Sequence, residues 1–164
     1  MQTVIPYYSM KYFAIYFLFL FSYCENKQQS NNKKSVSKTE NYDCQHCGMP
    51  SNDYPQWQAR LVLNEQNVWF CSPRCLVMRY HFAEKKAEKV ESIWVKDYYT
   101  QQFIDAKNAY FVCQSLLLGP MGNDLIPHKD RNSAQDFAKE HSGKEILQLK
   151  EIDTEKLKKI IQAK

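Results

Sequence analysis

Residues 44–50 read CQHCGMP and place two cysteines at the spacing Cys-x2-Cys, directly before a glycine. A second pair follows in CSPRC, residues 71–75, at the spacing Cys-x3-Cys. Two close cysteine pairs separated by a hairpin-sized insert match a tetrathiolate cage, because each pair can supply two corners of a tetrahedron. Soft thiolates suit both zinc and Cu(I). The candidate metal ligands in these two motifs are Cys44, Cys47, Cys71 and Cys75.

The same cysteines allow two other interpretations. In an oxidising compartment a set of cysteines commonly forms a disulfide framework, and these four thiols can form two bridges. A redox-active dithiol at Cys44 and Cys47 is disfavoured, because such a dithiol normally begins at a helix N-terminus. Here Gly48 and Pro50 indicate a turn instead. Metal binding and disulfide bonding therefore both remain open at this point.

The first 24 residues differ in composition from the rest of the chain. Lys11 precedes an uncharged apolar stretch, residues 12–21, and the segment ends at Cys24. This layout is typical of a secretory signal peptide. As a helix the apolar stretch spans about 15 Å, roughly half of a bilayer core, so a permanent membrane span is not expected. We expect residues 1–24 to be a lipoprotein-type signal, with Met10 as the true start and Cys24 acylated; the alternative is ordinary secretion with Cys24 as a free thiol.

The next segment, residues 25–41, contains a single apolar residue. It cannot bury enough apolar surface to fold, and we expect a flexible tether. The folded domain then occupies residues 42–164, outside the cytoplasm (the periplasm) and attached to the membrane through the lipid on Cys24. The net charge of +4 is mild, and the basic residues alternate with acids along most of the chain, so no nucleic-acid partner is expected.

The pattern of apolar residues after the first cysteine pair predicts an α+β domain. Residues 58–71 read as a β-hairpin with its turn at NEQN, and Ala59, Leu61 and Leu63 would share one face. A helix is expected to begin at Ser72, a good N-cap, with Pro73 at its first position. The fold class expected is α+β with small sheets and helices on one face, and the order of elements is compatible with two similar small αβ units.

Further elements are expected in the second half. A second helix is predicted to begin with Ser133 as its cap, and Gly143 would lie past its end. The segment FIDAKN, residues 103–108, is expected to form a turn. The expected strands are residues 91–99, 108–115 and 144–149, and the expected terminal helix is residues 154–164.

Two further sulfur-bearing residues bear on metal binding. Cys75 falls in the first turn of the predicted helix, where the positive end of the helix dipole favours a thiolate. The alternative is a buried cysteine that packs as a small apolar residue. Met121 lies between Pro120 and Gly122. A thioether held on such a tight loop suits a soft metal ion, and core packing is the alternative role.

With these residues in place, the chain resembles the NosL family of nitrous oxide reductase accessory lipoproteins. The matching motifs are CQHCGMP, WFCSPRCLVMRY, WVKDYYTQQFIDAKNAYFV, GPMGNDLIP and AQDFAKEHSGKEIL, over about residues 42–152. The resemblance implies a Cu(I)-binding lipoprotein chaperone that serves nitrous oxide reductase or a related copper enzyme and works with its maturation machinery. It also implies a fold of two similar small αβ units. Cys47 and Met49 fall on the family's Cys-Gly-Met motif, and Met121 falls on its Gly-Pro-Met-Gly motif.

A different class of function uses the same residues. The chain would then be a lipoprotein whose fold is stabilised by a tetrathiolate zinc ion or by disulfides, and its function would be to bind other proteins. The sequence contains no paired acids, Ser-His-Asp arrangement or phosphate loop, so an enzyme is not expected. The roles of Cys113 and His128 are left open. The full set of predicted metal ligands is Cys44, Cys47, Met49, Cys71, Cys75 and Met121.

Overall fold

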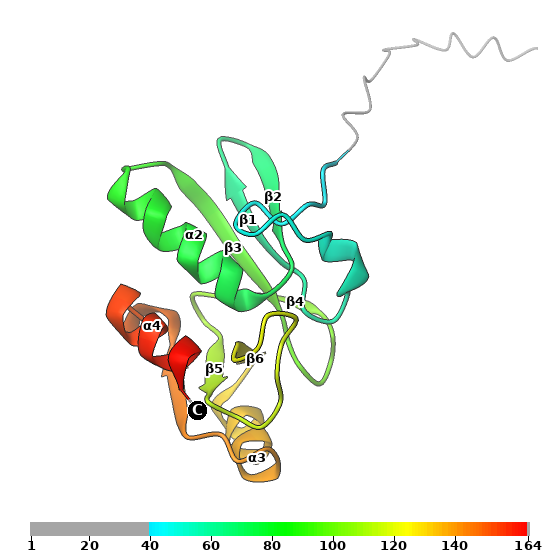
Figure 1. The fold of residues 1–164 in the computed structure, drawn as a ribbon, viewed down its shortest axis with the longest axis vertical. Helices are drawn as coiled ribbons and strands as arrows, with labels where there is room; N and C mark the ends of the chain where they lie inside the picture. Colours follow the sequence, from blue (N-terminus) through cyan, green and yellow to red (C-terminus); the bar gives the residue numbers. More distant parts are fainter. Residues whose placement is uncertain (1–39, 164) are drawn as a thin grey trace, which may run out of the picture. The chain divides into compact units, whose positions relative to one another are not determined.

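Two antiparallel sheets, each with a helix packed on it, make up residues 40–163, which are the residues that the computed structural model describes (Figure 1). The first sheet has the strand order β2-β1-β3-β4 and the second the order β6-β5-β7. The predicted α+β class is confirmed. The elements are η2 (Ser51–Asp53), β1 (Ala59–Leu63), β2 (Gln66–Phe70), α2 (Pro73–Lys85), β3 (Val90–Lys96), β4 (Phe103–Asp105), β5 (Tyr110–Cys113), β6 (Leu125–His128), α3 (Arg131–Glu140), β7 (Glu145–Gln148), η3 (Leu149–Glu151) and α4 (Thr154–Gln162).

The predictions for the N-terminal segment lie outside the described residues. These predictions are the signal peptide, the start at Met10, the acylation of Cys24 and nearly all of the tether. Within residues 40–163, none of the helices combines the length and the hydropathy that crossing a membrane requires.

The hairpin of β1 and β2 forms where the sequence predicts it, but its turn is shorter than predicted, because Gln66 and Asn67 belong to β2. Asn64 and Glu65 make a two-residue loop, and both have positive φ angles, of 48° and 62°. Such loops match the right-handed twist of the flanking strands. Ala59, Leu61 and Leu63 are buried, as the alternation predicts. This face of the sheet packs against α2.

Helix α2 also begins as predicted. Pro73 is its first residue, and the Ser72 side chain accepts a hydrogen bond from the Cys75 backbone N–H at 3.5 Å. The predicted start of α3 is wrong: its N-cap is Asp130, whose carboxylate accepts from the Ser133 N–H at 2.9 Å. A carboxylate both accepts this bond and lies favourably at the positive end of the helix, so the helix begins two residues before Ser133.

Two strands were not predicted. β4 lies in the segment expected to be a turn and pairs with β3, with Val95 opposite Ile104. β6 lies in a stretch for which no strand was predicted, and it contains Pro127. The structure accommodates this proline because β6 is at the edge of its sheet. The Pro127 carbonyl accepts a hydrogen bond from the Tyr98 N–H at 2.9 Å, which joins the edge of the second sheet to the segment after β3.

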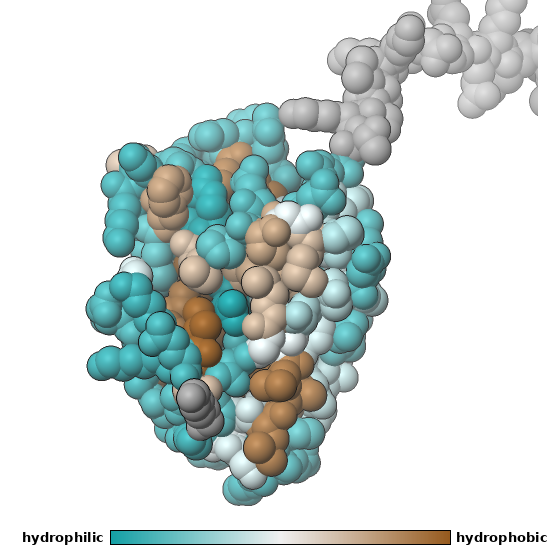
Figure 2. Space-filling view, viewed as in Figure 1, coloured by the Kyte–Doolittle hydropathy of each residue, from teal (hydrophilic) through white to brown (hydrophobic). Residues whose placement is uncertain are grey.

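The two sheets share one main core. On β5, Phe111 and Cys113 belong to this core, together with residues of β1, β3 and α2. Val112, between them, faces the other way and packs in a smaller cluster with Phe137 of α3. This alternation is what a strand covered on both faces requires. The face in Figure 2 is largely hydrophilic, with separate hydrophobic patches.

Candidate metal centre

The first cysteine pair lies in a tight knuckle. The Cys44 N–H donates to the Met49 carbonyl at 2.8 Å, and the Gly48 N–H donates to the Cys44 carbonyl at 2.8 Å. Gly48 has a φ of 80°, in the left-handed region that glycine adopts without strain. The Gln45 N–H donates to the Trp69 carbonyl at 3.1 Å, which fixes the knuckle to β2. The turn predicted from Gly48 is therefore what brings both thiols of the pair to one place.

The second cysteine pair lies where β2 ends and α2 begins. Cys71 is the first residue after β2, and Cys75 is in the first turn of α2. Both side chains are fully buried. The strand end and the helix start therefore hold the second pair rigidly beneath the knuckle.

The four thiols form one cluster. Their sulfur atoms all lie within 4.8 Å of one another. The Cys47–Cys71, Cys71–Cys75 and Cys75–Cys47 sulfur distances are 3.5, 3.8 and 4.0 Å. A tetrahedral ion with metal–sulfur bonds of about 2.3 Å needs sulfur–sulfur distances of roughly 3.8 Å. The donor set and its spacing thus fit a soft or borderline metal ion, and the five described cysteines are all free thiols.

Hydrogen bonds between the thiols shift their pKa values in opposite directions. Hydrogen bonds from Cys71 and Cys75 hold the pKa of Cys44 well below its usual range. The hydrogen bond to Cys44 raises the pKa of Cys71 to about 12, and the hydrogen bond to Cys44 raises the pKa of Cys75 as well. Hydrogen bonding within the cluster therefore favours the charged form at Cys44, by lowering its pKa, and disfavours it at Cys75, where the helix dipole was expected to favour a thiolate. A bound cation supplies the charge that lets the remaining thiols deprotonate.

A fifth sulfur reaches the cluster from the second half of the chain. The Met121 Sδ atom lies 3.6 Å from the Cys75 Sγ atom. Met121 is on a tight turn in which Gly119 and Gly122 exchange backbone hydrogen bonds of 2.8 and 3.1 Å. Gly122 has a φ of 93°, which requires glycine. Met49 packs against the core near the cluster, and its role as a ligand stays a prediction.

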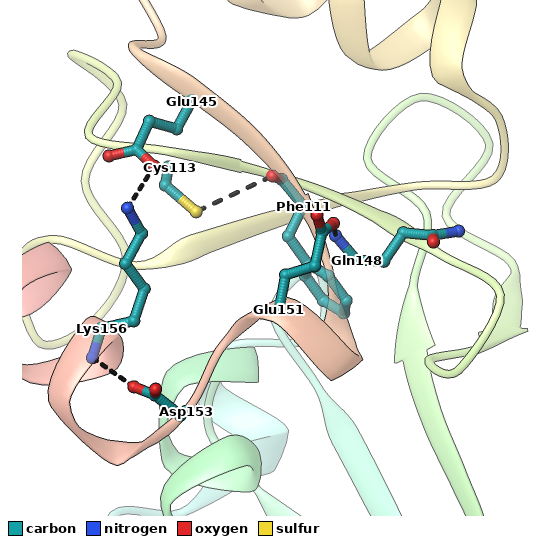
Figure 3. A network of polar contacts seen from close by, with 7 residues as sticks. All are labelled: Phe111, Cys113, Glu145, Gln148, Glu151, Asp153 and Lys156. Atoms are coloured by element: carbon teal, nitrogen blue, oxygen red, sulfur yellow. Dashed lines mark hydrogen bonds and ion pairs between the residues drawn. The ribbon is translucent and has the colours of Figure 1, made fainter.

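Cys113 lies in a different environment (Figure 3). Its buried thiol points toward the Phe111 carbonyl, 3.7 Å away, and burial raises its pKa to about 12. The ion pair between Lys156 and Glu145 lies beside it. Cys113 is therefore a core residue at the junction of β5, β7 and α4, and it is not a member of the four-cysteine cluster.

His128 lies in an aromatic cluster. Its side chain is fully buried, and the ring centroids of Tyr98, Tyr99 and Phe137 lie 5.9, 5.6 and 4.9 Å from its own. Burial lowers its pKa to about 4. His46, which neighbours the proposed ligands in sequence, is exposed.

Sequence reasoning missed two residues beside the cluster, Arg74 and Asp124. The Asp124 carboxylate is buried and accepts from the Arg74 N–H at 2.8 Å and from the Leu125 N–H at 2.9 Å. Burial raises its pKa to about 6. The signal available in the sequence was an acidic residue directly before an apolar run, a position where an unpaired carboxylate is costly.

Comparison with known proteins gives consistent matches. The family model NosL matches residues 35–157. The copper-binding lipoprotein NosL of Stutzerimonas stutzeri is 26% identical over 137 residues, which cover 79% of this chain and 71% of that protein. The crystal structure of the copper chaperone NosL from Shewanella denitrificans has a TM-score of 0.61 and 24% identity, and the match covers 71% of this chain and 92% of that one. The solution structure of apo-NosL from Achromobacter cycloclastes has a TM-score of 0.42 and 20% identity, with 60% and 87% covered.

Proposed function

This chain belongs to the NosL family, and on that premise we propose that it is an extracytoplasmic Cu(I)-binding chaperone that delivers copper to nitrous oxide reductase or a related copper enzyme. The observation that carries the proposal is the convergence of four cysteine sulfurs within 4.8 Å of one another, with a methionine sulfur 3.6 Å from one of them. All five donors are soft, as Cu(I) prefers. The proposed ligands are Cys44, Cys47, Cys71, Cys75 and Met121, with Met49 as a further candidate.

The thioether distinguishes copper from zinc as cargo. Zinc gains little from a thioether ligand, whereas Cu(I) accepts it readily. A thioether also needs no deprotonation, so its contribution persists when protons compete with the metal for thiolates. Met121 therefore biases the site toward Cu(I), and the more so in mildly acidic solution.

The burial of the sulfurs supports release to a partner. Cys44, Cys71 and Cys75 are buried, whereas Cys47 and Met121 are only partly buried. An acceptor protein can therefore reach the ion from the side of the two partly exposed donors. A copper-accepting enzyme and its maturation machinery are the proposed partners, and a lipid on Cys24 would hold the chaperone at the membrane. The name of the Stutzerimonas stutzeri relative, a copper-binding lipoprotein, supports copper as the cargo and the lipid anchor.

A structural zinc site is the second candidate, and the three buried thiols favour it. Structural zinc sites are closed tetrahedral cages, and they contribute directly to folding. A chaperone site instead gives up its ion while the fold persists. Adding a chelator to the reduced, metal-loaded protein separates the two functions: circular dichroism should remain that of a folded protein if copper is cargo. Loss of structure on metal removal would overturn the cargo role of the four-cysteine site and favour a structural metal.

Copper titration tests the proposal directly. Reduced wild-type protein should take up one Cu(I) ion per monomer in competition with a chromophoric Cu(I) probe. Cys47→Ser should lose most of this affinity, because an alcohol is a poor ligand for a soft ion. Cys113→Ala is the matched control, because it removes a buried thiol outside the cluster and should leave Cu(I) binding unchanged. Equal affinity of wild type and Cys47→Ser would overturn the assigned site.

A further inference from the structure

The turn that carries Met121 is tied to the helix that carries Cys75. The Arg74 Nη1 atom donates to the Met121 carbonyl at 2.8 Å and to the Asn123 carbonyl at 3.3 Å. The Arg74 backbone N–H donates to the Asp124 carboxylate at 2.8 Å. Arg74 immediately precedes Cys75 in the sequence. Arg74 therefore makes three hydrogen bonds to residues 121–124, directly beside the Cys75 thiol.

Asp124 and the glycines fix the other side of this turn. Asp124 is 3% exposed. A Cβ atom at Gly119 would lie 2.6 Å from the Asp124 Oδ2 atom and 2.8 Å from its Cβ atom, so only glycine fits there. Asn123 is anchored in turn by its side-chain N–H, which donates to the Ala163 carbonyl at 2.6 Å. The backbone of the turn is thus held from α2, from the C-terminal end of α4 and by close packing on a buried carboxylate.

The metal ligands differ in what holds them. The cysteines lie in the knuckle, at the end of β2 and at the start of α2, all of which are fixed by backbone hydrogen bonds. Met121 lies on a turn, and its thioether is an uncharged ligand with flexible torsions. Such a ligand contributes more affinity when it is positioned before the ion arrives, because ordering it afterwards costs conformational entropy. The contacts of Arg74 supply this positioning.

We infer that Arg74 is a positioning residue whose guanidinium, bonded to the Met121 and Asn123 carbonyls, holds the Met121 sulfur against the thiolate cluster and thereby sets the preference of the site for Cu(I) over thiolate-only metals. The inference rests on the proposed function and assigns a specificity-determining role to a residue outside the ligand set. Its effect reaches the ion only through Met121. Removing the guanidinium should therefore weaken binding of Cu(I) and leave binding of an ion that ignores the thioether unchanged.

The test is a double-mutant cycle with two metals. Wild type, Arg74→Gln, Met121→Leu and the double variant are titrated with Cu(I) against a chromophoric probe and, separately, with Cd(II), which reports the thiolates by its charge-transfer absorption. Residues that orient metal ligands typically affect affinity by roughly tenfold to a hundredfold. Arg74→Gln should lose Cu(I) affinity within that range, and so should Met121→Leu. The double variant should bind Cu(I) as Met121→Leu does, and Cd(II) affinity should be equal in all four proteins.

Arg79→Gln is the matched control. Arg79 is on the same helix, is partly buried and pairs with Glu88 at 2.6 Å, away from the turn. Its loss should leave both affinities at wild-type values. Arg74→Lys keeps a cationic donor and should retain more Cu(I) affinity than Arg74→Gln. It also serves as the test variant if Arg74→Gln does not fold.

Three outcomes would overturn the inference. The first is an Arg74→Gln variant with the Cu(I) affinity of wild type. The second is an Arg74→Gln substitution that lowers Cu(I) affinity equally in wild type and in Met121→Leu. The third is an Arg74→Gln variant that loses Cu(I) and Cd(II) affinity to the same extent. The proposed function fails separately, if wild type takes up no Cu(I) at all. When Met121→Leu weakens Cu(I) binding and Arg74→Gln does not, the ligand assignment stands and the positioning role alone is rejected.

Discussion

His128 should make the stability of the fold depend on pH in a defined window. The imidazole is fully buried among aromatic rings, and neither ring nitrogen has a hydrogen-bond partner within residues 40–163. Burial disfavours the charged form and lowers its pKa to about 4 from an ordinary value of 6.5, against the opposing attraction of Asp97 and Asp130. The folded state therefore excludes a proton that the unfolded chain accepts.

The magnitude follows from the difference between the two pKa values. The difference between 6.5 and about 4 corresponds to roughly 3 kcal/mol of unfolding free energy. Since the folded-state pKa is lowered, the unfolded chain binds more protons below pH 6.5. The titration of His128 therefore leaves the unfolding free energy unchanged above pH 6.5 and lowers it progressively as the pH falls from 6.5 to about 4.

The perturbation is His128→Leu, which removes the titrating group and both unpaired nitrogens. Urea unfolding of the reduced, metal-free protein is followed by circular dichroism for wild type and variant at several pH values from 7 to 4. At neutral pH the variant should be at least as stable as wild type, because each buried unpaired polar atom costs about 1–3 kcal/mol. On acidification the wild type should lose roughly 3 kcal/mol relative to the variant.

Taking the difference between the two proteins isolates His128. Asp124 also titrates in this window, because burial raises its pKa to about 6, but it is present in both proteins and cancels. His141→Leu is the control, since His141 stacks on Phe137 at 4.3 Å in the same cluster and its removal leaves His128 in place. A wild-type minus variant difference that stays constant from pH 7 to 4 would refute the reasoning.

Three further predictions concern the site and the N-terminal segment. Replacing both Met49 and Met121 with leucine keeps the apolar volume, so the protein should stay folded, at a cost in unfolding free energy below about 1.5 kcal/mol. The double variant should bind Cu(I) more weakly than wild type, most of all in mildly acidic solution. Equal Cu(I) affinities of wild type and variant in probe titrations, at both neutral and mildly acidic pH, would show that the methionines are packing residues. Gly119→Ala places a Cβ atom 2.6 Å from the Asp124 carboxylate. The unfolding free energy measured in urea should therefore fall by about 1–3 kcal/mol, and Cu(I) binding should weaken. Wild-type values of both quantities would contradict the close packing. Cys24→Ala should move the protein from the membrane to the soluble extracytoplasmic fraction, and a variant that stays membrane-bound would show that the apolar stretch is itself the anchor.

The parts of the fold that the sequence predicts are those specified by neighbouring residues. The Asn64–Glu65 turn, the Ser72 cap and Pro73 fix the hairpin and the start of α2 locally. The two cysteine motifs likewise predict their own local structure: the first contains a glycine turn, and the second lies at a helix N-terminus. Since the two motifs flank one hairpin, closing that hairpin brings them together. The four-cysteine cluster could therefore be anticipated before the structure.

The features that escaped prediction depend on contacts between distant segments. β6 contains Pro127, and only its place at the edge of a sheet makes the proline acceptable. Asp130 and Ser133 are both good caps, and the sequence gives no means of choosing between them. No sequence motif marks Arg74 as part of the site. Its partners at 121–124 are nearly fifty positions away, so its role appears only when the two sheets pack together.

In the proposed function, the unequal anchoring of the five sulfurs reconciles tight binding with release. Three buried thiols would hold the ion against water, and losing any of them would require the knuckle, the end of β2 or the start of α2 to move. Met121 would be the easiest ligand to displace, because its thioether carries no charge and its displacement disturbs only the contacts of one turn. An acceptor thiolate that approaches from the partly exposed side can therefore replace Met121 first and Cys47 next, with the ion coordinated throughout. Under the proposed function, transfer would then proceed by stepwise ligand exchange without unfolding, and the hydrogen bond from Arg74 to the Met121 carbonyl would set how readily the first step occurs.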